Sequence, residues 1–334
     1  MTTAHGFAAH KASGEFKPCE FELPPLGSDD VEIAVESCGI CHSDMSMLDN
    51  AWGFTQYPFV GGHEVIGRVV AMGSSVLGLK EGDLVGLGWN SRSCMHCDQC
   101  IGGDHNLCLS VQGTITHQTG GFADRVRCHW GWATKIPNGI DPLKCGPMLC
   151  GGVTVFNPLV QHAISPMSKV AVVGIGGLGH MAIKFAAAWG CEVTAISRSR
   201  SKEVETRELG AHHYIATSEA GALESVANKF DLIINTTDAA LPWDAYVATL
   251  APKGVLHTVG AAPKVEATVF PMLLGQKSLA SSPSGSIATT RKMLDFAARH
   301  QIEPVTEVYA MSDINEAFEK LRNGSPRYRL VLQR

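Results

Sequence analysis

Three short segments, far apart in the sequence, each contain a residue that can bind zinc. These residues are Cys41, His63 and Cys150. Two cysteines and one histidine form the ligand set of a catalytic zinc, and three protein ligands leave the fourth tetrahedral position open for a substrate oxygen. If the three segments converge in the fold, we expect an enzyme whose metal polarises a substrate oxygen.

Two polar residues close to these ligands could complete such a site. Asp44 could accept a hydrogen bond from the second ring nitrogen of His63 and so fix its tautomer. The hydroxyl of Ser43 could reach an alcohol oxygen and exchange a proton with it. The spacing alone leaves an alternative open, because a single buried cysteine or histidine is usually part of a core.

Four cysteines at short intervals predict a second, structural zinc site. Four thiolates fill every position of a tetrahedral zinc ion and would hold one loop closed. An iron–sulfur cluster is the alternative, but the wide last gap and the lack of a proline after the last cysteine depart from the ferredoxin pattern. The predicted ligands are Cys94, Cys97, Cys100 and Cys108.

A glycine-rich loop predicts dinucleotide binding, with a cofactor-free turn as the alternative. The loop follows an apolar strand pattern and opens a helix pattern. In this context the first glycine of G-x-G-x-x-G makes a tight turn, the second lets the backbone approach a pyrophosphate, and the third allows close helix packing. Free N–H groups at the helix N-terminus would face the phosphates. The loop residues are Gly174, Gly176, Gly177, Leu178 and Gly179.

The end of the following strand favours NADP(H) over NAD(H). A carboxylate about 20 residues beyond the loop would bind the ribose 2′-hydroxyl of NAD. No acid occurs there before Glu203, whereas hydroxyls and cations do. A guanidinium can bind a 2′-phosphate through two hydrogen bonds, and a lysine adds a point charge. The alternative is a solvated loop; the predicted phosphate contacts are Ser197, Arg198, Ser199 and Lys202.

Apolar periodicity predicts two domains around these motifs. From about residue 31 to 135, short apolar runs alternate with a period of two, which favours a compact, strand-rich domain. From residue 169, strands and helices alternate, which is typical of a doubly wound parallel sheet. A last strand near 328–332 should return to the first domain. We predict an α/β fold with a catalytic, zinc-binding domain at 1–146 and 296–334 and a dinucleotide-binding domain at 147–295.

Composition excludes several classes of protein. The 334 residues are 45% hydrophobic and 18% charged, enough for a large core. A net charge of −5 without a basic run gives no footprint for nucleic acid. No window approaches the ~20 apolar residues of a membrane span, and the N-terminus lacks signal-peptide features. We expect a soluble, cytoplasmic protein with no membrane partner, whose odd number of cysteines, 11, favours metal ligation or free thiols over disulfides.

Together these motifs resemble those of the zinc-dependent medium-chain alcohol dehydrogenases, in particular the cinnamyl alcohol dehydrogenase-like branch. The resemblance covers essentially the whole chain, through 38–44, 57–64, the four cysteines, 148–154 and the glycine loop, in the order of the family. It implies a GroES-like catalytic domain and a Rossmann cofactor domain. It also implies two zinc ions per chain, one of them catalytic and bound by Cys41, His63 and Cys150.

The resemblance also implies roles for residues that the spacing does not single out. Glu64 would be an alternative or transient zinc ligand, and Ser43 the first proton acceptor from the alcohol. His42 would meet the cofactor pyrophosphate, and Thr154 would lie near the nicotinamide. The nicotinamide end would further be lined by Val259, Gly260, Ala261, Ser282 and Ser284.

Three aromatic residues would lie near the metal by their position in the family. They would line an apolar substrate pocket, with domain core as the alternative, and they are Trp52, Phe54 and Trp89. One position departs from the pattern, because many relatives have a histidine where this chain has Ser46. A serine cannot titrate near neutral pH, so the proton relay would end in water or use another route.

The predicted function is reversible hydride transfer between NADPH and an aromatic or medium-chain aldehyde bound to zinc. Reduction of an imine or an activated C=C bond on the same scaffold is one alternative. A non-catalytic zinc- and nucleotide-binding redox sensor is another, although such a module would not need an open metal position. The expected small-molecule partner is an aldehyde or alcohol. The resemblance also implies a homo-oligomer that pairs through edge strands, with 265–279 as the candidate segment; we expect a homodimer, with a tetramer as the alternative.

Overall fold

The computed structural model describes residues 2–117, 119–324 and 326–334, and the chain divides into two compact units. The first unit runs as far as Cys150 and resumes at Ser286, and the second is Gly151–Gly285. The predicted boundary at 296 falls inside the helix α9 (Ile287–His300). This helix is continuous from its N-cap, where the Ser286 hydroxyl accepts the N–H of Thr289, so it belongs to the first unit as a whole.

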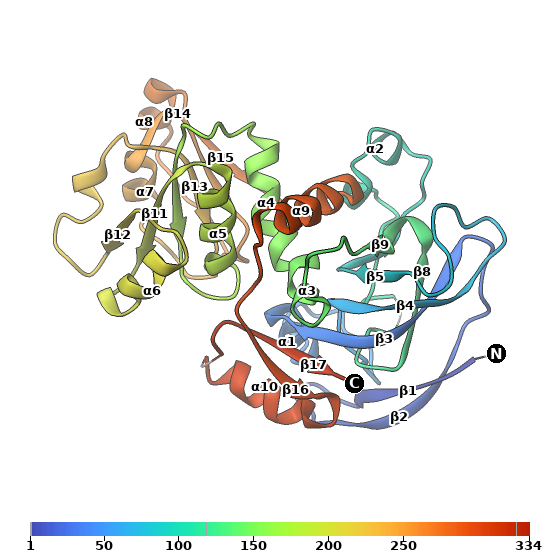
Figure 1. Ribbon diagram of the computed structural model, residues 1–334. Helices are drawn as coiled ribbons and strands as arrows, with labels where there is room; N and C mark the ends of the chain where they lie inside the picture. Colours follow the sequence, from blue (N-terminus) through green and yellow to red (C-terminus); the bar gives the residue numbers. More distant parts are fainter. Residues whose placement is uncertain (1, 118, 325) are drawn as a thin grey trace. The chain divides into compact units, whose positions relative to one another are not determined.

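A seven-stranded sheet forms the frame of the first unit. Its central strand, β3 (Asp30–Ile40), pairs with β4 (Val65–Met72), β8 (Arg125–His129) and β17 (Arg329–Gln333), all antiparallel. The last strand therefore returns to the first domain, as the sequence predicts, and Figure 1 draws it in red beside the blue β3. The outer strands are β5 (Leu84–Leu87), β9 (Thr134–Lys135) and β16 (Thr306–Ala310).

Smaller elements surround this sheet. The rings of Phe16, Phe122 and Phe318 pack together in the core, and Phe122 is fully buried. The surrounding strands are β1 (Thr2–Ala9), β2 (Phe16–Leu23), β6 (Asn90–Arg92) and β7 (Gln112–Gly113). The further helices are α1 (His42–Leu48), α2 (Asp98–Ile101), α3 (Pro142–Cys145) and α10 (Ile314–Arg322).

The second unit is a doubly wound parallel sheet. Its six strands lie in the order β12, β11, β10, β13, β14, β15, so the strand order reverses between β10 and β13. This is the order of a dinucleotide-binding Rossmann fold, and it confirms the predicted fold class. The strands are β10 (Lys169–Val173), β11 (Glu192–Ser197), β12 (His213–Ala216), β13 (Phe230–Asn235), β14 (Leu250–Thr258) and β15 (Ser278–Ser281).

Helices connect these strands, and three of them agree within a few residues with the helix patterns that the sequence shows at 180–189, 202–209 and 242–250. The helices are α4 (Gly151–Gln161), α5 (Gly179–Trp189), α6 (Glu203–Glu208), α7 (Trp243–Thr249) and α8 (Val269–Gly275). The patterns miss β12 and β15, which have four residues each and lie at the two edges of the sheet. Short edge strands bury little apolar surface, so their periodicity is weak.

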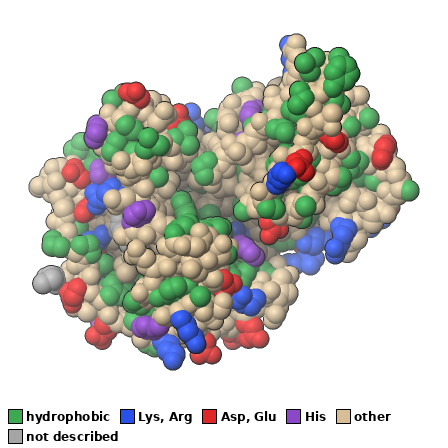
Figure 2. All heavy atoms as spheres, turned by 180° about the vertical axis from the view of Figure 1, so that it is seen from behind, with side chains coloured by type: hydrophobic (Ala, Val, Ile, Leu, Met, Phe, Trp, Pro, Cys, Tyr) green, Lys and Arg blue, Asp and Glu red, His purple; other side chains and the backbone are tan. Residues whose placement is uncertain are grey.

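The outer helix α8 is apolar yet exposed. Four of its side chains are between 65% and 71% exposed, and the neighbouring edge strand β15 contributes Leu279 at 37%. Figure 2 shows hydrophobic side chains gathered at the tip of the second unit where α8 lies. The four exposed residues are Val269, Phe270, Leu273 and Leu274.

No helix among the described residues is both long and apolar enough to cross a membrane.

Candidate active site

The three segments singled out in the sequence converge in the first unit. One potential ligand atom from each of Cys41, His63, Glu64 and Cys150 lies within 4.8 Å of the others. The two sulfur atoms are 3.8 Å apart, and Nε2 of His63 is 3.2 Å from Sγ of Cys150. These are distances at which one small cation could contact all of the groups.

Strand pairing explains why residues so distant in sequence meet. β3 and β4 are antiparallel, with Cys38 opposite Val65, so the end of β3 lies beside the beginning of β4. Cys41 immediately follows β3 as the N-cap of α1, and His63 lies two residues before β4 begins. Cys150 closes the first unit, directly before α4.

The carboxylate of Asp44 orients the histidine. Asp44 is fully buried, and its Oδ1 lies 3.1 Å from Nδ1 of His63 and accepts the N–H of Gly62 at 2.8 Å. Its Oδ2 accepts the N–H of Cys41 at 3.0 Å. An ionised carboxylate only accepts hydrogen bonds, so Nδ1 of His63 carries the proton and Nε2 faces the two sulfur atoms.

A buried ion pair, formed by Glu64 and Arg329, adjoins the two sulfur atoms. Arg329 of β17 donates to Oε1 of Glu64 and to the carbonyl oxygen of Ile40, the latter at 3.3 Å. Burial raises the pKa of Glu64 to about 7, while the charge of Arg329 acts in the opposite direction. Sequence reasoning missed Arg329. Its signal was a single cation inside an apolar strand pattern, which needs a buried partner.

The second oxygen of Glu64 supports metal binding here. Oε2 is buried without a hydrogen-bond partner among the described residues. A Cβ atom on Gly39 would lie 2.0 Å from Oε2, so the glycine makes room for the carboxylate. An unpartnered buried carboxylate oxygen is costly unless a cation compensates it. The cluster offers two sulfurs, one imidazole nitrogen and a carboxylate oxygen of Glu64, a donor set that fits zinc.

The four-cysteine loop forms a second cluster. Its sulfur atoms all lie within 4.8 Å of one another, and those of Cys94 and Cys100 are 3.9 Å apart. Backbone N–H groups of His96 and Cys97 lower the pKa of Cys94 to about 6, and the N–H of Ser110 donates to Sγ of Cys108 at 3.4 Å. Such N–H groups stabilise thiolates, so the loop fits a closed, four-thiolate zinc site.

The glycines of the dinucleotide loop differ in what surrounds them. Gly174 has a φ of +87°, which an L side chain rarely adopts. A Cβ on Gly179 would lie 1.8 Å from the carbonyl oxygen of Gly174, whereas a Cβ on Gly176 would meet nothing within 4 Å. The first and third glycines are therefore needed by the backbone itself, and the second leaves open space where a phosphate could approach.

The cations after β11 are not equivalent. Arg200 donates to Glu219 at 2.5 and 2.8 Å and to Glu203 at 2.7 Å, so its guanidinium is already paired. Lys202 donates to the carbonyl oxygen of Ile175 at 2.5 Å. Arg198 is exposed and has no carboxylate partner among the described residues. The predicted hydroxyls of Ser197 and Ser199 are half-buried and exposed respectively.

The remaining predicted cofactor residues occupy element ends. His42 is exposed at the start of α1, and Thr154 is buried in the first turn of α4. The other predicted residues follow the carboxyl ends of β14 and β15, the edge at which doubly wound sheets bind ligands. They are Val259, Gly260, Ala261, Ser282 and Ser284.

The three predicted pocket aromatics form a row that starts at His63, a candidate metal ligand. The ring of Trp89 lies edge-on to His63 with centroids 4.9 Å apart, and Trp52 lies edge-on to Trp89 at 6.0 Å. Phe54 stacks on Trp52 at 6.0 Å. Trp52 and Phe54 are 40% and 54% exposed, which excludes them from the core. The row can therefore offer an apolar surface next to His63.

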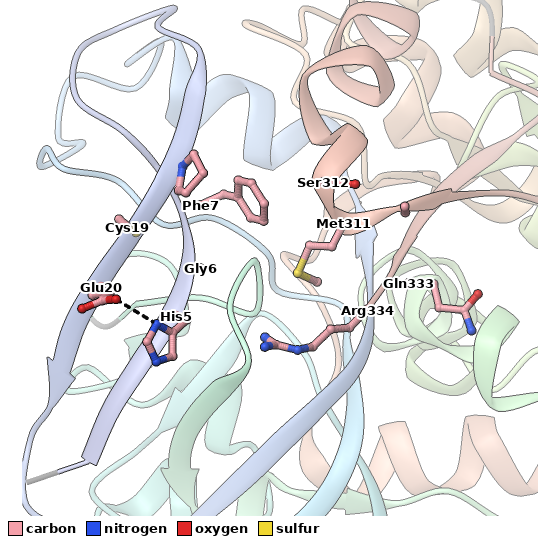
Figure 3. A pocket seen from close by; sticks show the side chains of 11 residues that line it. His5, Gly6, Phe7, Cys19, Glu20, Met311, Ser312, Gln333 and Arg334 are labelled. Atoms are coloured by element: carbon pink, nitrogen blue, oxygen red, sulfur yellow. Dashed lines mark ion pairs between the residues drawn. The ribbon is translucent and has the colours of Figure 1, made fainter.

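Another cavity of the first unit contains none of these groups. It has a volume of about 590 Å³ and lies between the β1–β2 hairpin and the segments around Met311 and Arg334 (Figure 3). An ion pair of His5 and Glu20, 3.4 Å long, lies at its edge. None of the predicted ligand or cofactor residues lines it, so it does not compete with the metal cluster as the candidate site.

Comparison with known proteins agrees with this geometry. Residues 27–138 match the family model described as alcohol dehydrogenase GroES-like domain, and 177–299 match that of zinc-binding dehydrogenase. The aldehyde reductase AdhA of Synechocystis is 49% identical over 327 residues, with 98% of this chain and 97% of the relative covered. The chain belongs to the zinc-dependent medium-chain alcohol dehydrogenases. The resemblance seen in the sequence is thereby confirmed.

Solved structures place it in the cinnamyl alcohol dehydrogenase-like branch of this family. The cinnamyl alcohol dehydrogenase SbCAD4 of Sorghum bicolor matches with a TM-score of 0.94 and 38% identity, covering 99% of this chain and 98% of that one. The corresponding enzyme of Helicobacter pylori, solved with NADP(H), matches with a TM-score of 0.90 and 29% identity, at 99% and 98% coverage.

The glycine loop yields a prediction that separates folding from cofactor binding. Gly179→Ala should lower the melting temperature, because its Cβ would overlap a backbone oxygen that cannot move aside. Gly176→Ala should leave the melting temperature within a few degrees of the parent but weaken dinucleotide binding, because its methyl group would occupy open space in the loop. Thermal melting and cofactor titration measure the two effects. Unchanged cofactor binding in Gly176→Ala would contradict this account.

Proposed function

We propose that this protein is a zinc- and NADP(H)-dependent alcohol dehydrogenase that reduces aldehydes to primary alcohols and catalyses the reverse reaction. The observation that carries the proposal is the convergence of Cys41, His63 and Cys150 with a carboxylate oxygen of the buried Glu64. When bound, zinc would polarise the carbonyl group and NADPH would supply the hydride. The name of the Synechocystis relative, an aldehyde reductase, supports the same reaction class.

The residues of the chain would hold the reactants and move the proton. Cys41, His63 and Cys150 would hold the metal, and Asp44 keeps the histidine ring in position. Ser43, half-buried in the first turn of α1, would give a proton to the oxygen during reduction and take one during oxidation. Overall, aldehyde, NADPH and one proton become alcohol and NADP⁺.

The proton route from Ser43 to solvent would depend on water. Ser46 is three residues further along α1, so the two hydroxyls occupy neighbouring positions on one helix face. Ser46 can pass a proton through its hydroxyl but cannot store one as an imidazole can. We expect proton exchange through water and no contribution from a titrating histidine at this position.

The first test combines metal content with activity. The parent protein should bind about two zinc ions per chain and reduce benzaldehyde with NADPH. Cys41→Ala should bind about one zinc and lose activity, because the metal that polarises the carbonyl is gone. Cys97→Ala should also lose about one zinc, from the structural loop, with a lower melting temperature. Elemental analysis and NADPH absorbance provide the measurements.

The half-buried Cys19 offers a matched control for this test. Cys19→Ala should retain both zinc ions and full activity, since this thiol belongs to neither cluster. Benzaldehyde reduction that survives in Cys41→Ala would refute the zinc-dependent mechanism. Reduction of an imine or an activated C=C bond by that variant would favour the alternative reaction, and NADPH binding without any turnover by the parent would favour the redox sensor.

We propose aromatic or medium-chain aldehydes as substrates because of the row formed by Trp52, Phe54 and Trp89. An aromatic substrate ring in contact with these side chains would gain apolar contact area. It would also gain ring-to-ring attraction of about 0.5–1.5 kcal/mol per ring pair beyond burial. Phe54→Ala should therefore raise KM for benzaldehyde about threefold to tenfold and leave KM for acetaldehyde nearly unchanged. Equal changes in KM for both aldehydes would remove Phe54 from the pocket.

We propose NADP(H) as the cofactor because Arg198, directly after β11, is exposed and has no carboxylate partner within the described part of the chain. The Helicobacter pylori neighbour, solved with NADP(H), supports this assignment. Hydrogen bonds to charged groups contribute about 1.5–3 kcal/mol. Arg198→Ala should thus weaken NADPH binding by about tenfold to a hundredfold and NADH binding far less.

Arg200 is the matched control for the cofactor test. It has the same charge in the same loop, but two glutamates already bind its guanidinium. Arg200→Ala should change NADPH affinity less than Arg198→Ala does, as measured by fluorescence titration. Equal losses for NADPH and NADH in Arg198→Ala would refute the phosphate assignment.

We propose a homodimer in which the α8 and β15 surfaces of two copies meet. β15 is an edge strand with one unpaired side, and exposed edges with apolar neighbours are normally covered. A two-fold axis would place the same exposed side chains of both copies against each other. Leu274→Glu should give a monomer by light scattering, and Leu109→Glu, exposed in the first unit, should not. A monomeric parent protein at micromolar concentration would contradict the dimer.

A further inference from the structure

Three residues of the second unit form a hydrogen-bonded chain that the proposed reaction does not use. His257 of β14 is fully buried; its Nδ1 lies 2.9 Å from Nε2 of His162, and its Nε2 lies 2.9 Å from Oγ of Ser282. His162, directly after α4, and Ser282, directly after β15, are half-buried. The chain therefore links two partly exposed groups through one buried imidazole.

The hydrogen bonds from His162 through His257 to Ser282 end at the carboxyl edge of the sheet, where doubly wound sheets bind ligands. β14 ends one residue after His257, and β15 ends one residue before Ser282. In doubly wound sheets each half takes one mononucleotide outside the carboxyl ends of its strands. The glycine loop follows β10 and serves the half formed by β10, β11 and β12. The half formed by β13, β14 and β15 is then left for the second mononucleotide, which in NADP(H) carries the nicotinamide.

Hydrogen-bond direction in the chain decides what Ser282 offers to a ligand. A neutral imidazole has one donor and one acceptor. If His162 donates to His257, then His257 donates to Ser282, and the serine hydroxyl is free to donate to a ligand. In the reverse direction the Ser282 hydroxyl donates to His257, and only its oxygen lone pairs remain for a ligand.

Protonation of His162 selects one of these two directions, because a protonated imidazole can only donate. Burial and the neighbouring His162 lower the pKa of His257 to about 4, so His257 stays neutral while His162 titrates. Burial also lowers the pKa of His162. The other titratable or charged groups on this and the surrounding elements are His180 and Lys184 of α5, Asp231 of β13, Lys253 of β14, and Asp244 and Tyr246 of α7. The elements α4, α8 and β15 have no charged residue.

Both acids in this set already accept hydrogen bonds from other residues. Asp231 accepts the N–H of Lys169 at 2.7 Å, near the amino end of β13, and Asp244 accepts the N–H and hydroxyl of Thr268. Nδ1 of His180 donates to the carbonyl oxygen of Gly176 at 3.0 Å, because a carbonyl oxygen can only accept. Among the described residues, His257 is the titratable group that is hydrogen-bonded to Ser282, and His162 is in turn hydrogen-bonded to His257.

We propose that His162 and His257 are positioning residues that set the hydrogen-bond direction of Ser282 toward the nicotinamide half of NADP(H), with protonated His162 making Ser282 a donor. The proposal rests on the NADP(H) binding proposed above. It couples cofactor affinity to the charge of His162, which is linked to Ser282 through two hydrogen bonds and one buried imidazole. One neutral hydrogen bond is worth about 0.5–1.5 kcal/mol, which corresponds to a change in affinity of about twofold to tenfold.

The experiment compares NADPH with 2′,5′-ADP, which lacks the nicotinamide, on the full-length zinc-loaded protein. Dissociation constants are measured between about pH 5.5 and pH 8 for the parent and for His162→Gln, which cannot titrate. We expect the ratio of the NADPH dissociation constant of the parent to that of His162→Gln to change about twofold to tenfold across this pH range. The same ratio for 2′,5′-ADP should stay constant, because this probe does not reach Ser282.

Ser282 supplies the matched variants. In a Ser282→Ala background, adding His162→Gln should not change how the NADPH dissociation constant varies with pH. Ser282→Thr should restore the effect of His162→Gln, because it keeps the hydroxyl. Ser282 is half-buried, so these substitutions do not open a core cavity.

A second readout tests the coupling without mutation. Since linkage is reciprocal, NADPH must shift the titration midpoint of His162 by the factor measured in the binding experiment, whereas 2′,5′-ADP must not. Nuclear magnetic resonance of the imidazole provides this midpoint. A constant NADPH ratio together with an unmoved midpoint would overturn the positioning role. Failure of both ligands to bind would instead refute the proposed cofactor.

Discussion

The buried carboxylate of Asp44 is the constraint on which the candidate metal centre depends. It accepts the N–H groups of Cys41 and Gly62 and faces the ring of His63. An ionised carboxylate without water costs several kcal/mol unless its oxygens are hydrogen-bonded. The end of β3 and the loop before β4 must therefore close around it, and in doing so they bring a sulfur and an imidazole to the same point.

A second buried charge balances the same site from another direction. Glu64 lies beside the two sulfur atoms of the cluster. Its Oε1 accepts a hydrogen bond from Arg329, and its Oε2 has no hydrogen-bond partner among the residues that the structure describes. The absence of a side chain at Gly39 leaves space for that oxygen. The arginine offsets the carboxylate but does not satisfy both oxygens, so the pocket remains suited to a further cation. The geometry thus favours metal binding over a neutral, closed core.

The features that the sequence predicts well are those in which close neighbours act together. The four cysteines and the glycine loop each occupy one short segment, so spacing and flanking patterns suffice. The candidate metal ligands come from three segments, so residue type could suggest the set but spacing could not show that the segments converge, and the resemblance to a family supplied that support. Arg329 and the pair of His162 and His257 could not be located this way, because their partners are more than 90 residues away. Secondary-structure patterns identified the buried strands and missed the short edge strands, where little apolar surface is buried.

The return of β17 to the first unit has a consequence for how the protein is made. The second unit is inserted between Cys150 and Ser286. Both β17, which pairs with β3, and Arg329, the counter-ion of Glu64, follow that insertion in the sequence. During synthesis, the sulfur and imidazole ligands emerge long before Arg329 does. Domains generally fold as units while the chain elongates. The inserted unit can therefore fold first, and the candidate metal centre reaches its final charge balance only when the last strand joins the sheet.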